Sequence, residues 1–121
     1  MNFIRKHLAS YRYAVRGIGL AFRAENNMIV HLAAGVAVVA VNYLLHVTAT
    51  EWLITLILVG VALSAEVFNT AIEKLADRVS REHDPLIGQA KDLAAGAVLI
   101  VCILAVICAG VIYVPYLILN S

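Results

Sequence analysis

The stretch that decides the fold is Glu66-Val-Phe-Asn69-Thr-Ala-Ile-Glu73-Lys-Leu-Ala-Asp77, which begins inside an apolar run starting at Trp52. Read as a helix with about 100° per residue, it places its four numbered polar residues on one stripe about 80° wide. Glu66 then lies at membrane depth, where a carboxylate that faces lipid costs roughly 3 kcal/mol or more. We therefore expect Glu66 to face a protein interior or a polar cavity, and a functional site is the default interpretation.

The composition is that of an integral membrane protein. Of the 121 residues 63% are hydrophobic and only 14% are charged, which is too apolar for a soluble domain of this size. We expect one domain over residues 1–121. The first long apolar run starts only at Met28, which fits a cleavable signal peptide poorly. Cys102 and Cys108 lack metal-ligand partners and are interpreted as packing residues.

The periodicity predicts an all-α membrane protein with three transmembrane helices and an amphipathic surface helix before them. Residues 1–27 carry five basic side chains between apolar residues spaced three and four apart. This helix can lie on an anionic membrane surface or pack on the protein's own cytoplasmic end, and both can be true. The predicted spans are 28–47, 52–72 and 93–114.

Local signals set the expected ends of these helices. Thr50 is a candidate N-cap for the second span, whose helix should continue to Val79. Asp84 followed by Pro85 predicts the start of the third spanning helix at Pro85. Pro115 is expected to help end that helix.

The basic residues predict the orientation. Five precede the first span, and four more (Lys74, Arg78, Arg81 and Lys91) lie between the second and third spans. By the positive-inside rule the N-terminus and residues 73–92 are cytoplasmic. A multi-pass protein of the bacterial inner membrane is expected.

Small residues recur within the spans, at 33–35, 60–64 and 94–97. Such residues let helices approach closely in lipid. Three helices can scarcely enclose a carboxylate alone, so oligomerisation is the economical way to bury Glu66.

On this topology acids from three segments reach one depth near the cytoplasmic leaflet. The polar groups gathered there are Glu25, Glu66, Asn69, Glu73, Asp77, Lys91 and Asp92. Mg²⁺ is commonly held by one or two carboxylates plus nucleotide phosphates, a lysine can neutralise phosphate charge, and a deep carboxylate can act as general base. These are the parts that phosphoryl transfer needs. The alternative is that the charges only mark the membrane boundary, which we favour for Asp77.

Other polar residues have simpler interpretations. His31 and His46, near opposite ends of the first span, are interpreted as packed or interfacial histidines rather than ligands. No GxxxxGK[ST] motif is present, which excludes the common soluble nucleotide folds, so a nucleotide site must be built from helices.

Two motifs carry a family resemblance. Glu66-x-x-Asn69-Thr-Ala-Ile-Glu73-x-x-x-Asp77 is followed by Gly88-Gln-Ala-Lys91-Asp92-x-Ala-Ala-Gly-Ala-Val. Together they resemble the bacterial integral-membrane diacylglycerol kinase family, from Arg16-Gly17 through the third span. The undecaprenol kinase branch is the most similar, given Arg-x-Glu25-x-Asn27 and His83-Asp84-Pro85-Leu86.

The resemblance implies a homotrimer with active sites shared between neighbouring subunits, and transfer of the ATP γ-phosphoryl group to a lipid hydroxyl at the cytoplasmic face. By the same resemblance, Glu66 matches the general base, with Asn69 beside it, and Glu25 and Glu73 match the metal-binding acids. The implied nucleotide contacts are Tyr13, Glu25, Glu73, Glu82, His83, Lys91 and Asp92. The implied cofactor is Mg²⁺.

We therefore expect a membrane lipid kinase with undecaprenol as the favoured acceptor and diacylglycerol as the alternative. Its expected partners are ATP, the lipid alcohol, the bilayer and further copies of the chain, with no nucleic acid. One rival is a proton-coupled transport subunit in which Glu66 relays protons, but the outer halves of the spans are almost wholly apolar. The other rival is a non-catalytic helical scaffold, which has no reason to gather these acids at one level.

Overall fold

The computed structural model describes residues 2–24, 26–80 and 84–119, and all regular structure in this part of the chain is helical. Three of its helices are long and apolar enough to cross a membrane, which confirms the predicted number of spans. The four helices are α1 (Phe3–Ala24), α2 (Asn26–Leu45), α3 (Ala49–Val79) and α4 (Pro85–Leu119).

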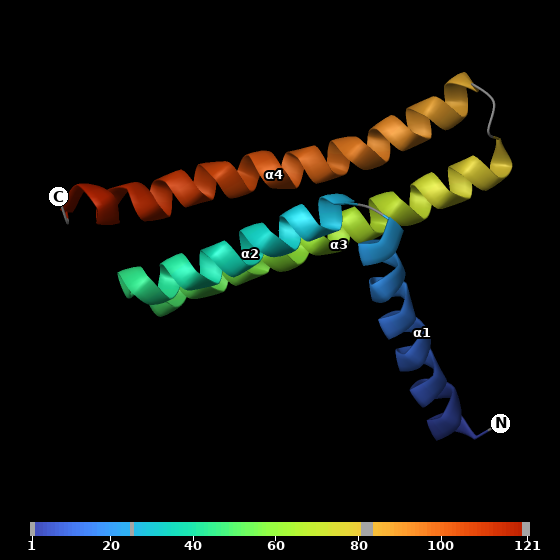
Figure 1. Cartoon of the computed structure of the whole chain (residues 1–121), viewed down its shortest axis with the longest axis horizontal. Helices are drawn as coiled ribbons and strands as arrows, with labels where there is room; N and C mark the ends of the chain where they lie inside the picture. Colours follow the sequence, from blue (N-terminus) through green and yellow to red (C-terminus); the bar gives the residue numbers. More distant parts are fainter. Residues whose placement is uncertain (1, 25, 81–83, 120–121) are drawn as a thin grey trace.

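The three spanning helices form a layered bundle from which α1 departs. Figure 1 shows α2 and α3 side by side, α4 running along them, and α1 leaving at a steep angle. α3 is the central element because it contacts each of the other three helices. Ala21 is the one buried residue of α1. A location of α1 on a membrane surface stays a prediction.

The start of α3 corrects the expected N-cap. The cap is Thr48, not Thr50: the Thr48 hydroxyl accepts from the Glu51 N–H at 3.2 Å, and Glu51 Oε1 accepts from the Thr48 N–H at 3.0 Å. This reciprocal pair is a capping box, which needs Glu or Gln three residues after the cap. Three residues after Thr50 stands Leu53, so Thr50 cannot form one.

The end of α2 lies two residues before the predicted limit of the first span. His46 adopts φ 54°, a left-handed conformation, and the Val47 N–H donates to the Asn42 carbonyl at 3.3 Å. This bond from the second residue beyond the helix is the Schellman pattern. The chain therefore turns sharply after Leu45 and enters α3 within a few residues.

α4 begins at Pro85, as predicted, and Asp84 Oδ1 accepts from the Leu86 N–H at 2.9 Å. The expectation that Pro115 helps to end α4 is wrong, since the helix continues to Leu119. Proline is tolerated in membrane helices where neighbouring groups hold the segment. The hydroxyl of Tyr116, one residue after Pro115, hydrogen-bonds Glu51 Oε1 and so ties this last part of α4 to α3.

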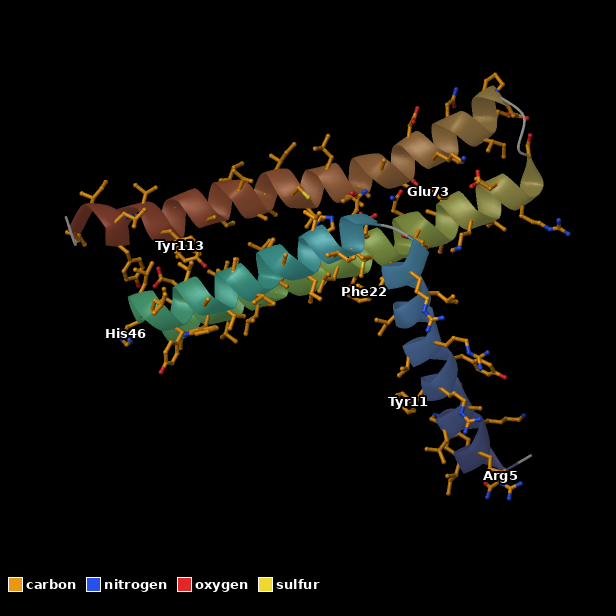
Figure 2. The ribbon with its side chains drawn as sticks, viewed as in Figure 1. Arg5, Tyr11, Phe22, His46, Glu73 and Tyr113 are labelled. Atoms are coloured by element: carbon orange, nitrogen blue, oxygen red, sulfur yellow. The ribbon has the colours of Figure 1, made fainter. Side chains whose placement is uncertain are left out.

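The halves of the spans that were expected to be almost wholly apolar contain a buried polar network. Asn42 is fully buried, and its amide donates to Thr55 Oγ1 at 2.8 Å and accepts from the Tyr113 hydroxyl at 2.5 Å. Figure 2 shows Tyr113 on the side of α4 that faces the other spans. We call these three residues, together with Glu51 and Tyr116, the Asn42 network. It joins α2, α3 and α4.

Close helix packing occurs at one of the predicted small-residue positions. Gly35 of α2 is buried, and a Cβ added there would lie 2.8 Å from Val59 Cγ1 of α3. At Gly60 and Gly96 an added Cβ would meet nothing within 4 Å. Within one chain, therefore, Gly35 serves helix contact, whereas those two glycines lie on open faces.

Candidate active site

Glu66 is buried within the single chain. Only 1% of the residue is exposed, although it lies in the middle of α3. The prediction that it faces a protein interior is confirmed. The expectation that three helices can scarcely enclose this carboxylate alone is wrong, because α2 and α3 of one chain already place His31 and Asn69 against it.

The carboxylate of Glu66 has a polar neighbour at each oxygen. Asn69 Nδ2 lies 3.5 Å from Glu66 Oε1, and His31 Nε2 lies 3.5 Å from Glu66 Oε2. The Asn69 contact is at the long limit of a hydrogen bond, and the His31 contact is within ion-pair distance. Catalytic hydrogen bonds are often long without substrate and tighten in the complex.

Asn69 connects Glu66 to Glu73. Its Nδ2 also lies 3.5 Å from Glu73 Oε1, so one amide donor is shared between two carboxylates. Its Oδ1 is buried without a hydrogen-bond partner among the described residues. A buried polar atom of this kind requires an explanation, and an unfilled ligand position is one.

Glu73 is half-buried on the same face of α3, seven residues and about 10.5 Å along the axis from Glu66. Figure 2 shows it on the stretch of α3 that passes the junction between α1 and α2. The predicted polar stripe is therefore present from Glu66 to Glu73. We call His31, Glu66, Asn69 and Glu73 the Glu66 cluster.

Lys91 of α4 approaches α3 further along the same stripe. Its ammonium forms a hydrogen-bonded ion pair with Asp77. Lys91 lies just before the predicted span 93–114. Its hydrogen bond to Asp77 raises the pKa of the Lys91 ammonium. Exposed pairs of this kind contribute little to stability, so a bound phosphate can replace Asp77 as the partner of Lys91 at low cost.

The structure does not bring two of the predicted nucleotide contacts to the Glu66 cluster. Asp92 is exposed and lines an open groove on α4 with Gln89 and Gly96. Tyr13 is exposed on α1, eleven residues or about 16 Å before the end of that helix, with the Arg16 guanidinium 5.7 Å from its ring centre. Because α1 projects away from the bundle (Figure 1), Tyr13, in the middle of α1, lies away from the Glu66 cluster of its own chain.

Three more residues that were expected in the site, Glu25, Glu82 and His83, lie outside the described residues. One functional candidate was missed. His31 was interpreted as a packed or interfacial histidine, yet it contacts Glu66. The sequence signal that could have found it is its predicted depth in the membrane. On the predicted topology His31 lies in the cytoplasmic half of the first span, as Glu66 does in the second span.

The donor set fits Mg²⁺ that is held jointly with a nucleotide. Among the described residues no three His, Cys, Asp or Glu side chains gather to enclose a metal. Mg²⁺ seldom needs such a cage, since one or two carboxylates and phosphate oxygens suffice. The Glu73 carboxylate and the unpartnered Asn69 Oδ1 provide the oxygen ligands that a hard cation prefers.

Comparison with known proteins identifies the family. Residues 12–113 match the family described as prokaryotic diacylglycerol kinase. The chain belongs to this family. It is therefore a lipid kinase, as the motifs predicted, and the family together with three helices apolar enough to span a membrane supports a multi-pass protein of the bacterial inner membrane.

Individual relatives carry two names. A protein of Bacillus subtilis named undecaprenol kinase is 37% identical over 116 residues, which cover 96% of this chain and 94% of that protein. A protein of Synechocystis named diacylglycerol kinase is 38% identical over 109 residues, covering 89% of this chain and 62% of that protein. The Escherichia coli K12 diacylglycerol kinase is 38% identical over 87 residues, covering 72% and 66%.

Proposed function

We propose that this protein transfers the γ-phosphoryl group of ATP to the hydroxyl of undecaprenol at the cytoplasmic face of the membrane. The observation that carries the proposal is the carboxylate of Glu66, 1% exposed and in line on one helix face with Asn69 and Glu73. The buried Glu66 is suited to act as base on a lipid hydroxyl within the membrane. Glu73, which lies nearer the cytoplasmic surface, is suited to meet the nucleotide.

The proposed step uses Glu66 as general base. Glu66 takes the proton of the lipid hydroxyl as the hydroxyl oxygen forms a bond to the γ-phosphorus. The bond between that phosphorus and the β–γ bridging oxygen breaks, and ADP leaves with the electron pair. Asn69 holds Glu66 in place. Lys91 leaves its ion pair with Asp77, binds the nucleotide and neutralises phosphate charge.

Glu73, with Glu25 by resemblance, would hold Mg²⁺ together with the ATP phosphates. When bound, Mg²⁺ supplies charge neutralisation of the phosphate oxygens. Glu73 carries this role because it lies toward the end of the bundle that faces water-borne ATP, while Glu66 lies deeper. The five basic residues before the first span support a cytoplasmic N-terminus and therefore this side of the membrane.

A homotrimer remains part of the proposal, although burial of Glu66 no longer argues for it. Tyr13 and Asp92, which the resemblance assigns to the nucleotide, lie away from the Glu66 cluster of their own chain. A neighbouring subunit can bring equivalent residues to the cluster. Gly60 and Gly96 offer open helix faces where such a neighbour can approach closely.

Undecaprenol is favoured over diacylglycerol as acceptor because the undecaprenol kinase relative is 37% identical over 94% of its own length, whereas the diacylglycerol kinases are either matched over less of their length (62% for Synechocystis) or less identical (26% for Haemophilus influenzae). The test is purified protein in detergent with labelled ATP, Mg²⁺, and the two lipids offered side by side at equal concentration. Faster labelling of undecaprenol supports the proposal. Faster labelling of diacylglycerol would replace the acceptor, and labelling of neither would overturn the proposed reaction.

A further inference from the structure

His31 occupies a position that the proposed reaction has not yet used. Its Nε2 lies 3.5 Å from Glu66 Oε2, and the two side chains are 16% and 2% exposed. We propose that His31 is a positioning residue for the base: its Nε2–H donates to Glu66 Oε2 and holds the carboxylate toward the acceptor hydroxyl. This inference rests on the proposed function of Glu66.

The two neighbours of Glu66 divide its oxygens between them. Asn69 lies at Oε1 and comes from the same helix, whereas His31 lies at Oε2 and comes from α2. A carboxylate accepts up to about four hydrogen bonds, so both contacts leave room for the lipid hydroxyl. Because Asn69 moves with α3, the contact with His31 is the one that fixes the carboxylate relative to a second helix.

The apolar surroundings of His31 strengthen its contact with the Glu66 carboxylate. His31 lines a half-open apolar cleft of about 320 Å³ between α2, α3 and α4, whose other lining includes Ala34, Val59 and Ala105. Two further lining residues, Thr55 and Tyr113, have hydroxyls that bond Asn42. His31 is thus placed between an apolar space and the carboxylate, where low local polarity strengthens a hydrogen bond.

A purely structural role for His31 predicts different behaviour. In that case His31 only satisfies a buried carboxylate, and its replacement lowers stability while the folded enzyme works normally. A positioning role predicts a loss of kcat at unchanged KM for ATP, because misplacement of a reacting group by about 1 Å can cost up to 10²-fold in rate.

The test compares His31→Leu with His31→Gln, whose side-chain amide can donate in place of Nε2–H. We expect His31→Leu to lower kcat by about 10- to 10²-fold with unchanged KM for ATP, and His31→Gln to recover most of that loss. His46→Leu, at the exposed residue just beyond the other end of that helix, is the matched control and should keep wild-type kcat per folded molecule. Normal kcat in His31→Leu, or equal losses in Leu and Gln variants, would overturn the inference.

A double-mutant cycle separates this inference from the reaction itself. If His31 acts through Glu66, adding His31→Leu to Glu66→Gln produces no further loss of the residual rate. Losses that multiply would show that His31 acts elsewhere. Wild-type protein that phosphorylates no lipid would overturn the proposed function, whereas an active wild type with an unaffected His31→Leu variant would overturn only the role of His31.

Discussion

Two buried asparagines in this molecule have very different surroundings. Asn42 makes hydrogen bonds of 2.8 and 2.5 Å to side chains of two other helices, Thr55 and Tyr113. Asn69 makes two contacts of 3.5 Å to carboxylates of its own helix and leaves Oδ1 without a partner among the described residues.

The difference separates a structural polar network from a site prepared for a ligand. Short, satisfied bonds between helices fix their register and leave nothing for a substrate to add. Long contacts with an unfilled acceptor are completed only when another group arrives. The Asn42 network should therefore determine stability, and the Glu66 cluster should determine turnover.

The largest expected effect is on Glu66. Glu66→Gln keeps the shape of the side chain but removes the base, so kcat should fall by about 10²- to 10⁴-fold. Unfolding temperature in the same detergent should change little. Glu51→Gln, which removes a carboxylate in the first turn of the same helix, is the matched control and should turn over normally. Full activity of Glu66→Gln would remove Glu66 from the mechanism.

The two asparagines provide a direct test of the division. Asn69→Leu should lower kcat by about 10- to 10²-fold, with little change in the free energy of unfolding. Asn42→Leu should lower the free energy of unfolding by about 1–2 kcal/mol, since it removes the partner of the half-buried Tyr113 hydroxyl and the bond to Thr55, whose hydroxyl keeps only its bonds to carbonyls of its own helix. Activity per folded molecule and denaturation in one detergent check both, and a reversed pattern would refute the assignment of the two regions.

Glu73 should affect the metal requirement more than the chemical step. Glu73→Gln is expected to raise the Mg²⁺ concentration for half-maximal activity by about tenfold or more, with kcat at saturating Mg²⁺ reduced less. The measurement is a Mg²⁺ titration of labelled phosphate transfer at fixed ATP. An unaltered titration curve would mean that Glu73 does not hold the metal.

The sequence predicts this fold well where the signal is local. The apolar runs and Asp84-Pro85 define three spanning helices and the start of α4, because both signals act within one helix. The N-cap of α3 also follows from a local signal, since Thr48 stands three residues before Glu51 and forms the capping box that Thr50 cannot form.

Contacts between helices lie beyond what periodicity can supply. A helical pattern shows that Glu66, Asn69 and Glu73 share a face, yet it does not say what the next helix brings to that face. His31 is the case in point, because its contact depends on how α2 rotates against α3 at Gly35 and Val59. The same limit applies to the last part of α4, where the hydroxyl of Tyr116, one residue after Pro115, reaches Glu51 of α3.

The smallest expected effect is on Tyr116, at the edge of the Asn42 network. Tyr116→Phe removes the hydrogen bond to Glu51, but Glu51 is only half-buried and keeps its capping contact with Thr48. The loss should therefore be about 0.5 kcal/mol, near the average for an interhelical hydrogen bond in a membrane protein. Thermal unfolding of Tyr116→Phe, compared with wild type and with Asn42→Leu in the same detergent, measures this loss. If Tyr116→Phe instead lowered kcat, the first turn of α3 would be coupled to the Glu66 cluster. The separation between a stability region and a turnover region would then fail.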